Sequence, residues 1–433
     1  MLPLLQFDYE PEDKKRCFAG LAVLALALIF AFFGRAAPDP GAPPQALVFT
    51  QWWEDEMEAG SLQALIGEFR ERHPEIDIRL DTRPYGEIRD WLLRAGDPGN
   101  ETPPPFPRPD ILGLDPRWIG ELSKNRRLEP LDSGLTDSGG EGTGFYASRG
   151  TVALPLVSFM TLLFYNIESL EAAGFDRPPK NRTEFISAAR AATDPRKGRY
   201  GFTLALSPEN PEGITTDIYS WLRAANGPLL DRGKPRFNTP EVTEVLGFLR
   251  ELYRGKYISP DSFSKTGVEK REEFMSGRAA MMISSVSDIH RVRERNIPFG
   301  VTTVPGAASS FGKPAFGLYG WYAGISESSA NKAGARLFLS FLAENRSRIG
   351  AAAWAVPGSR NAGQGYINDD PLFSKVYSIY EAGEVLEEFT GHTGVTGEEN
   401  LVREALYRMF EEGRGPGETA AAIQRGWEAL RNP

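Results

Sequence analysis

The sequence predicts an α/β protein with two lobes, preceded by one membrane-spanning helix. Three observations support this prediction. Apolar strands alternate with amphipathic helices from residue 46 onward. The alternation begins again after the Gly/Ser-rich stretch 137–144, and a helical tail follows. A long uncharged apolar run lies near the N-terminus, from Cys17 to Gly34.

The N-terminal run has the length of a short membrane span. The basic residues 14–16 precede it, which predicts that the N-terminus lies inside and the remainder outside the cytoplasm. The segment that follows offers only a weak signal-peptide cleavage site, so a retained anchor and a removed signal peptide both stay open, and we prefer the anchor. We expect a basic cytoplasmic segment, a membrane segment and a Pro-rich tether, at residues 1–16, 17–34 and 35–45 respectively.

Composition argues against several classes of function. The 433 residues suffice for about two to three domains. Basic side chains number 49 and acidic ones 58, a net charge of −9, which disfavours binding of nucleic acid. The single cysteine and three histidines leave no disulfide within the chain and no cysteine-rich zinc site. We therefore expect neither a metal nor another cofactor.

The first half reads as a strand–helix–strand unit followed by a further strand. Residues 46–50 form a short apolar strand, and apolar residues at helical spacing run from Leu62 to Phe69 before Pro74. Residues 76–80 alternate as a half-buried strand does. Residues 111–114 form the next strand, and a short helix follows. A helix between two apolar strands normally crosses over onto one sheet, so we expect a parallel sheet.

The second half repeats the alternation. Asn181 with Glu184 three positions later marks a helix start that is close to a capping box. The expected strands are "TVALPL", "TLLFYN", "AAMMIS", "FGVTTVPG" and "GLYGWYAGIS". The expected helices are "SLEAAG", "NRTEFISAARAA", residues 242–253, residues 271–276 and "NKAGARLFLSFLAE".

Several of these fragments, in this order, resemble one protein family. They are "LVFTQWW" with "LIGEFRERHPEIDIRL", "PDILGLD" with "LEPLD", "ALPLVSFMTLLFYNIESLEAAGFDRPPKNRTEF", "FMSGRAAMMIS", "VTTVPG" with "GLYGWYAGIS" and "FLSFL", and "GETAAAIQRGWEAL". The chain resembles the extracytoplasmic solute-binding proteins of ABC importers, of the sugar-binding, maltose-binding-protein-like type. The resemblance spans almost all of residues 46–430.

The resemblance implies a type II periplasmic-binding-protein fold, whose two lobes close on a solute like a hinge. The N-lobe would comprise residues 46–154 and 303–347, and the C-lobe residues 155–302 and 348–433. Crossing segments are expected near 153–156, 300–304 and 345–356. The implied protein is a monomer that carries a neutral sugar or oligosaccharide to the permease subunits of the importer, on the outer side of the membrane.

Two adjacent tryptophans, Trp52 and Trp53, follow the first strand. Residues just past the carboxyl end of a strand line the crevice of an α/β sheet. Sugar rings pack their C–H faces on aromatic rings, so these tryptophans are candidate ligand contacts, with Trp53 favoured. The alternative is that both rings cover the edge of the lobe.

Further candidates follow from the same topology or from the resemblance. Asp115 and Arg117 follow the strand at 111–114 and would bind hydroxyls, unless they form a surface turn. Tyr319 and Trp321 share one strand face by their spacing and match an aromatic, Gly-rich family segment, with packing between lobes as the alternative. Other candidates are Tyr165, Ser285 and Ser287. Where the family often has a tryptophan, this chain has "SSVSD", which places a maltose-like site in doubt.

Enzyme signatures are missing from the sequence. It contains no G-x-S-x-G, P-loop, H-E-x-x-H or dinucleotide motif. Paired carboxylates without a local signature leave a glycosidase as a remote alternative. The stronger alternative is a membrane-anchored ligand sensor that presents its closed form to a signalling partner.

Overall fold

The computed structural model describes residues 44–94, 107–131, 145–147, 150–208, 213–231, 233–307, 315–358, 367, 369–386 and 398–431. The apolar run 17–34 and its flanking segments lie outside these residues, as does most of the tether. None of the helices in the described ranges is long and apolar enough to cross a membrane.

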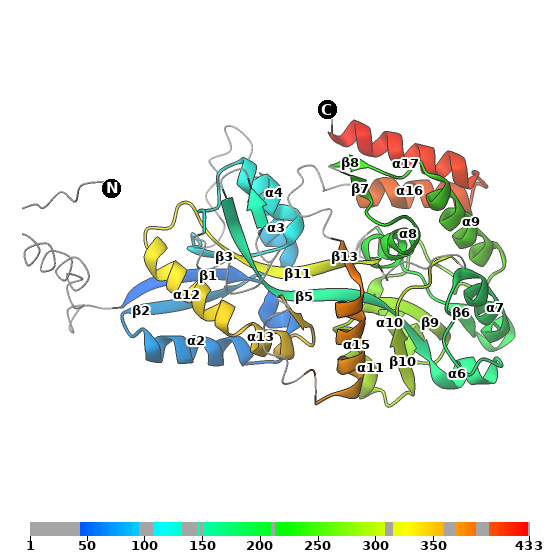
Figure 1. The fold of residues 1–433 in the computed structure, drawn as a ribbon, viewed down its shortest axis with the longest axis horizontal. Coiled ribbons are helices and arrows are strands. Elements are labelled where there is room, and N and C mark those ends of the chain that lie inside the picture. The colour runs from blue at the N-terminus through cyan, green and yellow to red at the C-terminus, as the bar shows by residue number, and fades with distance from the viewer. Residues whose placement is uncertain are drawn as a thin grey trace, which may run out of the picture.

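The chain forms two lobes that share long strands (Figure 1). Elements of the first lobe are β1 (Gln45–Gln51), η1 (Trp53–Glu56), α2 (Ser61–Arg72), β2 (Ile76–Thr82), α3 (Tyr85–Arg94), β3 (Ile111–Leu114), α4 (Pro116–Lys124), α12 (Lys332–Glu344) and α13 (Arg346–Ala352). Strands that run along or between the lobes are β4 (Phe145–Ala147), β5 (Gly150–Asn166), β11 (Ala315–Ile325), β12 (Val356–Pro357) and β13 (Glu384–Leu386).

The second lobe contains the remaining elements. In chain order they are α6 (Ile167–Ala172), α7 (Arg182–Ala192), η3 (Pro195–Lys197), β6 (Tyr200–Phe202), the π-helix η4 (Ile214–Ile218), α8 (Tyr219–Asn226), β7 (Leu230–Asp231), β8 (Lys234–Pro235), α9 (Pro240–Arg254), α10 (Gly267–Met275), β9 (Ala279–Ser285), α11 (Asp288–Glu294), β10 (Phe299–Thr302), α15 (Pro371–Ala382), α16 (Glu398–Phe410) and α17 (Pro416–Arg431).

The parallel pairing expected of the first three strands is present, but the main sheet as a whole is mixed. Its strand order is β2-β1-β3-β11-β5-β9-β6. The pairs β1/β2, β1/β3 and β6/β9 are parallel, whereas β11 runs antiparallel to both β3 and β5, and β5 runs antiparallel to β9. The α/β class itself is confirmed. β11 enters the sheet from the side of the second lobe, so it runs opposite to its neighbours β3 and β5.

One strand, β5, connects the two lobes. The two expected strands "TVALPL" and "TLLFYN" are parts of this single strand, which continues through Pro155. Residues 152–154, Leu156 and Val157 belong to the core of the first lobe, and Leu163 belongs to a core of the second. Met160 and Leu162 already belong to another core of the second lobe, so β5 passes between the lobes near residues 158–159, a little after the expected crossing at 153–156.

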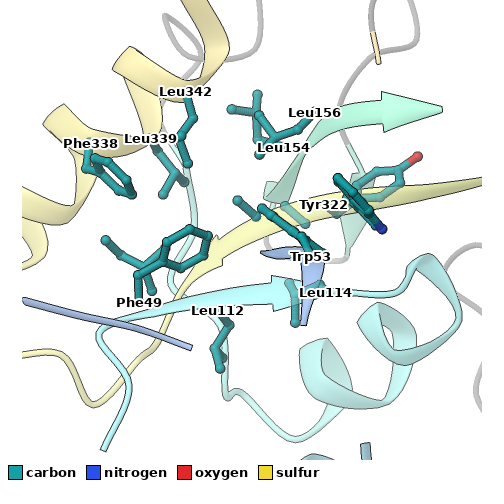
Figure 2. Packing of buried hydrophobic residues seen from close by; sticks show 14 of the residues in the cluster. Phe49, Trp53, Leu112, Leu114, Leu154, Leu156, Tyr322, Phe338, Leu339 and Leu342 are labelled. Carbon is teal, nitrogen blue, oxygen red and sulfur yellow. The ribbon is translucent and has the colours of Figure 1, made fainter. Parts of the chain in front are cut away.

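Each lobe has its own hydrophobic core. Figure 2 shows the first, in which Phe49 and Trp53 meet Phe338, Leu112 and neighbouring aliphatic side chains. The second lobe has one cluster around Trp221 and another around Phe164 and Tyr377. Separate cores allow each lobe to stay rigid while the connecting segments move. The lobe boundaries given above stay a prediction.

Candidate functional site

Five aromatic side chains form a continuous row in the first lobe, at the carboxyl ends of β1 and β3. We call Trp52, Trp53, Tyr85, Trp118 and Trp321 the aromatic row. Trp53 stacks on Trp321 with ring centroids 5.3 Å apart and planes 11° apart. Trp52 meets Trp53 edge-on at 5.9 Å and contacts Tyr85 and Trp118 on its other side. The three sequence-predicted tryptophans thus lie together.

The rings of the row cover one another. Trp52, Trp53 and Trp321 are 5%, 1% and 2% exposed. Among the described residues, Nε1 of Trp53 has no hydrogen-bond acceptor although it is buried. A solute therefore reaches the Trp53–Trp321 pair only after a movement of these rings or of the lobes. Ligand contact by these residues stays a prediction.

Two glycines let the row pack closely. A Cβ at Gly113 on β3 would lie 2.8 Å from Cβ of Gln51 and 3.1 Å from the Trp53 ring. A Cβ at Gly320 would lie 2.4 Å from the carbonyl oxygen of Val157 on β5. The predicted close approach of backbone beside Trp321 is therefore present, and it brings the ring of Trp321 beside the crossing strand.

The row ends at the passage between the lobes. Phe159 on β5 contacts Trp321 edge-on, with ring centroids 5.2 Å apart. Phe159 also packs against the core of the first lobe and against the Phe164 cluster of the second. The aromatic row of the first lobe thus continues to β5, the strand that connects the two lobes.

Asp115 and Arg117 form a charged cluster beside the row. Asp115 is buried; it is the N-cap of α4 and accepts the backbone N–H of Arg117. The Arg117 guanidinium donates to both carboxylate oxygens of Asp115, through Nε at 3.0 Å and Nη2 at 2.9 Å. Nη2 also donates to the Tyr85 hydroxyl at 2.9 Å, and that hydroxyl donates to Asp115.

Burial and charge set the ionisation of this cluster. Burial raises the pKa of Tyr85, and the neighbouring Asp115 carboxylate adds to the rise. Burial alone would lower the pKa of Arg117, but Asp115, Tyr85 and Glu399 together raise it well above its ordinary value. Arg117 is therefore a permanent cation, and the Tyr85 hydroxyl keeps its proton.

Glu399 joins this cluster from the second lobe. Nη1 of Arg117 donates to Oε1 of Glu399 at 2.9 Å, and the two side chains are 22% and 13% exposed. Glu399 lies in the first turn of α16, whose apolar face packs into the Trp221 cluster. The ion pair therefore crosses from one lobe to the other.

Hydroxyl groups lie at the crossing on the side of the second lobe. The hydroxyl of Ser287 donates to Oγ of Ser285 at 2.9 Å. Both residues are half-buried, Ser285 at the end of β9 and Ser287 two positions later. Ser285 pairs with Thr161 of β5. The Thr161 hydroxyl lies 2.6 Å from that of Ser220 on α8. Small hydroxyl side chains therefore occupy the segment "SSVSD", which the sequence singled out.

Tyr165 and Tyr319 are placed differently from these groups. Tyr165 lies near the end of β5 opposite Gly300, where a Cβ would be 2.3 Å from its hydroxyl oxygen, and it packs against the Trp221 cluster. It is several residues beyond the crossing and away from the aromatic row. Tyr319 pairs through its backbone with Phe159, and its side chain lies outside the described residues. Both remain predictions as ligand contacts.

Sequence reasoning missed Tyr85, Trp118, Phe159 and Glu399. Tyr85 begins a helix, α3, that was not expected at all, and only the fold brings it to Asp115. Glu399 lies 282 positions from Arg117. A charge pattern within one segment carries no signal for such a pair. No group of three or more potential metal ligands occurs in the described parts of the chain.

The family model for bacterial extracellular solute-binding proteins matches residues 53–349. The chain belongs to this family. The matched range begins at Trp53 and extends through β11 and α12, so it includes most of the site described above. The predicted resemblance is confirmed.

Curated relatives of this solute-binding protein are distant. A binding protein of Brucella abortus (strain 2308) is 23% identical over 287 residues, which cover 63% of this chain and 66% of that protein. The maltotriose-binding protein of Pyrococcus abyssi is 25% identical over 256 residues, which cover 56% of this chain and 50% of that protein. The match thus spans between a half and just under two thirds of the length of these relatives.

Solved structures share the fold over nearly the whole solute-binding protein. Maltose-bound MalE3 of T. maritima has a TM-score of 0.71 at 20% identity, covering 89% of this chain and 99% of that one. The sugar-binding protein MalE of Xanthomonas citri has a TM-score of 0.73 at 18% identity, covering 90% and 98%. The two-lobed fold of these proteins is therefore the fold of this chain. Its relatives are binding proteins, in keeping with the prediction that it is not an enzyme.

Proposed function

We propose that this chain is the extracytoplasmic solute-binding component of an ABC importer and that it captures a neutral sugar or oligosaccharide between its lobes. The Trp53–Trp321 pair at the crossing strand carries this proposal. Aromatic faces bind the C–H faces of sugar rings, and a movement of the lobes would uncover the buried Trp53 and Trp321 rings for this task. The sugar-binding neighbours in the same fold support the choice of solute class.

The two lobes would supply different parts of the site. The first lobe offers stacked rings, and the second offers the hydroxyls of Ser285 and Ser287 on the other side of β5. A sugar needs both kinds of group, because its ring faces are apolar and its hydroxyls must keep hydrogen bonds when they leave water. Closure would bring the two halves onto one solute, and opening at the permease would release it.

The charges at the junction favour a neutral solute. Arg117 is paired with two carboxylates, Asp115 and Glu399, so one positive charge faces two negative ones. A phosphorylated or carboxylated solute would need free cationic donors there. The cluster instead presents a small excess of negative charge, which repels anions.

The test is a thermal-unfolding screen of the full-length chain in detergent against neutral sugars, sugar phosphates, polyamines and peptides. We expect neutral mono- or oligosaccharides to raise the melting temperature. A solute at a hundredfold excess over its Kd adds about 2.7 kcal/mol to the free energy of unfolding. Stabilisation by sugar phosphates alone would contradict the neutral class. A chain that responds only to peptides or to none of the panel would contradict sugar capture.

Permease delivery needs its own test. The full-length chain, affinity-tagged and purified from its native membrane, should bring permease and ATPase subunits with it when the expected sugar is present. Recovery of a signalling protein without transporter subunits would contradict the importer and support the sensor considered at the outset.

A further inference from the structure

The Arg117–Glu399 ion pair joins two bodies that otherwise have separate cores. Arg117 extends from α4, whose Trp118, Ile119 and Leu122 lie in the first-lobe core. Glu399 extends from α16, whose Val402 and Leu406 lie in the Trp221 cluster. A hinge motion that separates the lobes must break this contact, whereas it leaves contacts inside either lobe intact.

The Arg117 end of the pair is held rigidly. Asp115 fixes the guanidinium at two nitrogens, Tyr85 binds one of them again, and the N-cap fixes the Asp115 carboxylate against α4. Only Nη1 points to the second lobe, where it meets Glu399. A cation oriented in advance by its own lobe loses little conformational entropy when it binds the opposite carboxylate.

The Arg117–Glu399 pair is shielded from water well enough to contribute to the stability of the joined lobes. Both side chains are less than a quarter exposed, unlike the ion pairs on the surface of this chain such as Arg408–Glu404, which are 43% and 57% exposed. Exposed pairs contribute little because water and salt screen them. A partly buried, charge-assisted hydrogen bond contributes more, and here its contribution belongs only to the joined state of the lobes.

We propose that Arg117 and Glu399 form an interlobe latch, which favours the closed arrangement and slows release of the solute. Arg117 is then a positioning residue that acts through Glu399 and does not need to touch the solute. The effect on solute release rests on the proposed function, but the effect on the lobes of the solute-free chain does not.

The test measures the separation of the two helices that carry the latch. Spin labels are placed at Lys124→Cys on α4 and Tyr407→Cys on α16, both exposed, in full-length chain whose single cysteine is replaced by Cys17→Ser. Pulsed electron resonance then gives the distance distribution in detergent without solute. We expect Glu399→Gln to shift this distribution to longer distances, while Glu404→Gln on the same helix leaves it unchanged.

The second readout is the dissociation rate of whichever panel sugar stabilises the parent. Loss of one charge-assisted contact that exists only in the closed form should speed dissociation by about fivefold to thirtyfold in Glu399→Gln. Glu404→Gln should dissociate at the parent rate. If Glu399→Gln fails to fold by circular dichroism, Glu399→Asp replaces it, because its shorter carboxylate keeps the charge but loses the 2.9 Å contact.

Distance distributions of the Glu399 variant and the parent that superimpose would overturn the latch. A shifted distribution in the solute-free chain supports it whether or not any sugar binds. If no panel compound binds the parent, the proposed function fails, and the distance measurement alone still decides on the latch. A shift of equal size in Glu404→Gln would also overturn the latch, because it would show a general effect of charge on α16.

Discussion

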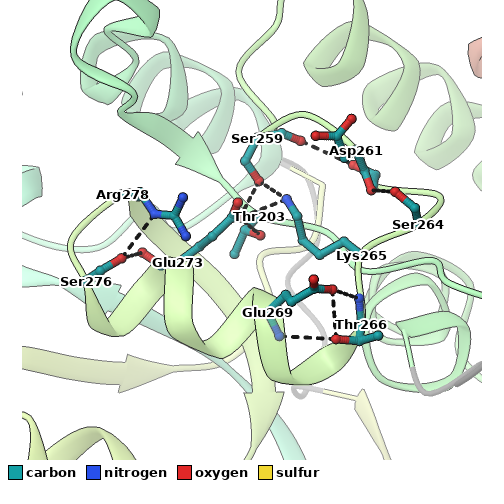
Figure 3. Close-up of polar contacts among 11 residues, drawn as sticks. Thr203, Ser259, Asp261, Ser264, Lys265, Thr266, Glu269, Glu273, Ser276 and Arg278 are labelled. Carbon is teal, nitrogen blue, oxygen red and sulfur yellow. Dashed lines mark hydrogen bonds and ion pairs between the residues drawn. The ribbon is translucent and has the colours of Figure 1, made fainter.

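The two lobes use buried charges in opposite ways. In the second lobe, Lys265 lies 2.8 Å from Glu273, and the hydroxyls of Ser259 and Thr203 donate to the same carboxylate oxygen (Figure 3). Every partner in that group belongs to the second lobe. In the first lobe, Arg117 donates hydrogen bonds to Asp115 and Tyr85 of its own lobe and also to Glu399 across the junction.

This difference separates a structural role from a conformational one. Burial opposes the charge of Glu273, but hydrogen bonds from Lys265, Ser259 and Thr203 outweigh it, so its pKa is lowered and it stays ionised. A network that closes within one lobe stabilises that lobe in every state of the hinge. An ion pair between lobes stabilises one state only. Variants of the two kinds should therefore move different observables.

The largest effect on stability is expected inside the second lobe. Lys270 donates to Asp217 at 2.9 Å, and the two side chains are 2% and 0% exposed. Lys270→Ala removes the Lys270 ammonium from the buried Asp217 carboxylate, so the free energy of unfolding should fall by about 3–5 kcal/mol. Urea unfolding followed by circular dichroism measures this loss.

The matched control replaces both charges, Lys270→Met with Asp217→Leu, and should recover most of the lost stability. By contrast, Glu399→Gln should lower the free energy of unfolding by only about 1–2 kcal/mol, because its pair is partly exposed and each lobe keeps its own core without it. Equal losses of unfolding free energy in Lys270→Ala and Glu399→Gln would contradict the distinction between an ion pair within one lobe and an ion pair between the lobes.

A smaller effect on stability, with a larger one on binding, is expected at Trp53. Trp53→Phe should lower the free energy of unfolding by about 1–2 kcal/mol, since a smaller ring leaves part of the stack on Trp321 unfilled. It should also weaken sugar binding at least severalfold, as titration calorimetry would measure.

The matched control is Trp221→Phe in the second-lobe core, which makes the same chemical change among Phe185, Phe202 and Phe248. It should cost similar stability and leave binding unchanged. Equal loss of affinity in both variants would mean that binding follows global stability.

The smallest effect concerns Glu184 on α7, far from the junction. Hydrogen bonds from the Arg177 side chain and then from the Lys180 backbone lower the pKa of Glu184 to about 2. The pKa in the folded state lies below that in the unfolded state, so the contribution to stability is complete above about pH 4.5 and is lost as the pH falls toward 2. Glu184→Gln should cost less than about 1 kcal/mol at pH 7, because the side chain is one third exposed.

Urea midpoints of parent and Glu184→Gln at pH 7, 4 and 2.5 check this prediction. The midpoints should converge as the pH falls. A difference that grows toward acid would mean that the sign of the pKa shift is wrong.

The sequence predicted the elements of this fold more reliably than their connections. β1, α2, β2 and β3 lie within a few residues of their expected positions, because apolar periodicity and Pro74 mark them locally. The union of two expected strands into β5 and the antiparallel entry of β11 were not predictable in the same way. Both depend on pairing between segments far apart in the chain.

The candidate site shows the same limit. Trp52, Trp53 and Trp321 were identified because strand ends and alternation are local signals, and the fold does bring them together. Their depth of burial could not be predicted, since it results from their mutual contact. Arg117 was identified as a binding residue, but its partner Glu399 comes from the other lobe. Only the packed structure shows that this charge is already engaged.

The most direct test of solute capture between the lobes is hydrogen–deuterium exchange of the full-length chain, with and without the neutral sugar that stabilises it most. We predict slower exchange at residues 49–54 and 318–323 of the first-lobe side, at 156–162 of the crossing strand, and at 283–288 of the second-lobe side. Residues 420–427, in the distant helix α17, should not change. Protection confined to one lobe, or located away from the crossing strand, would contradict the account.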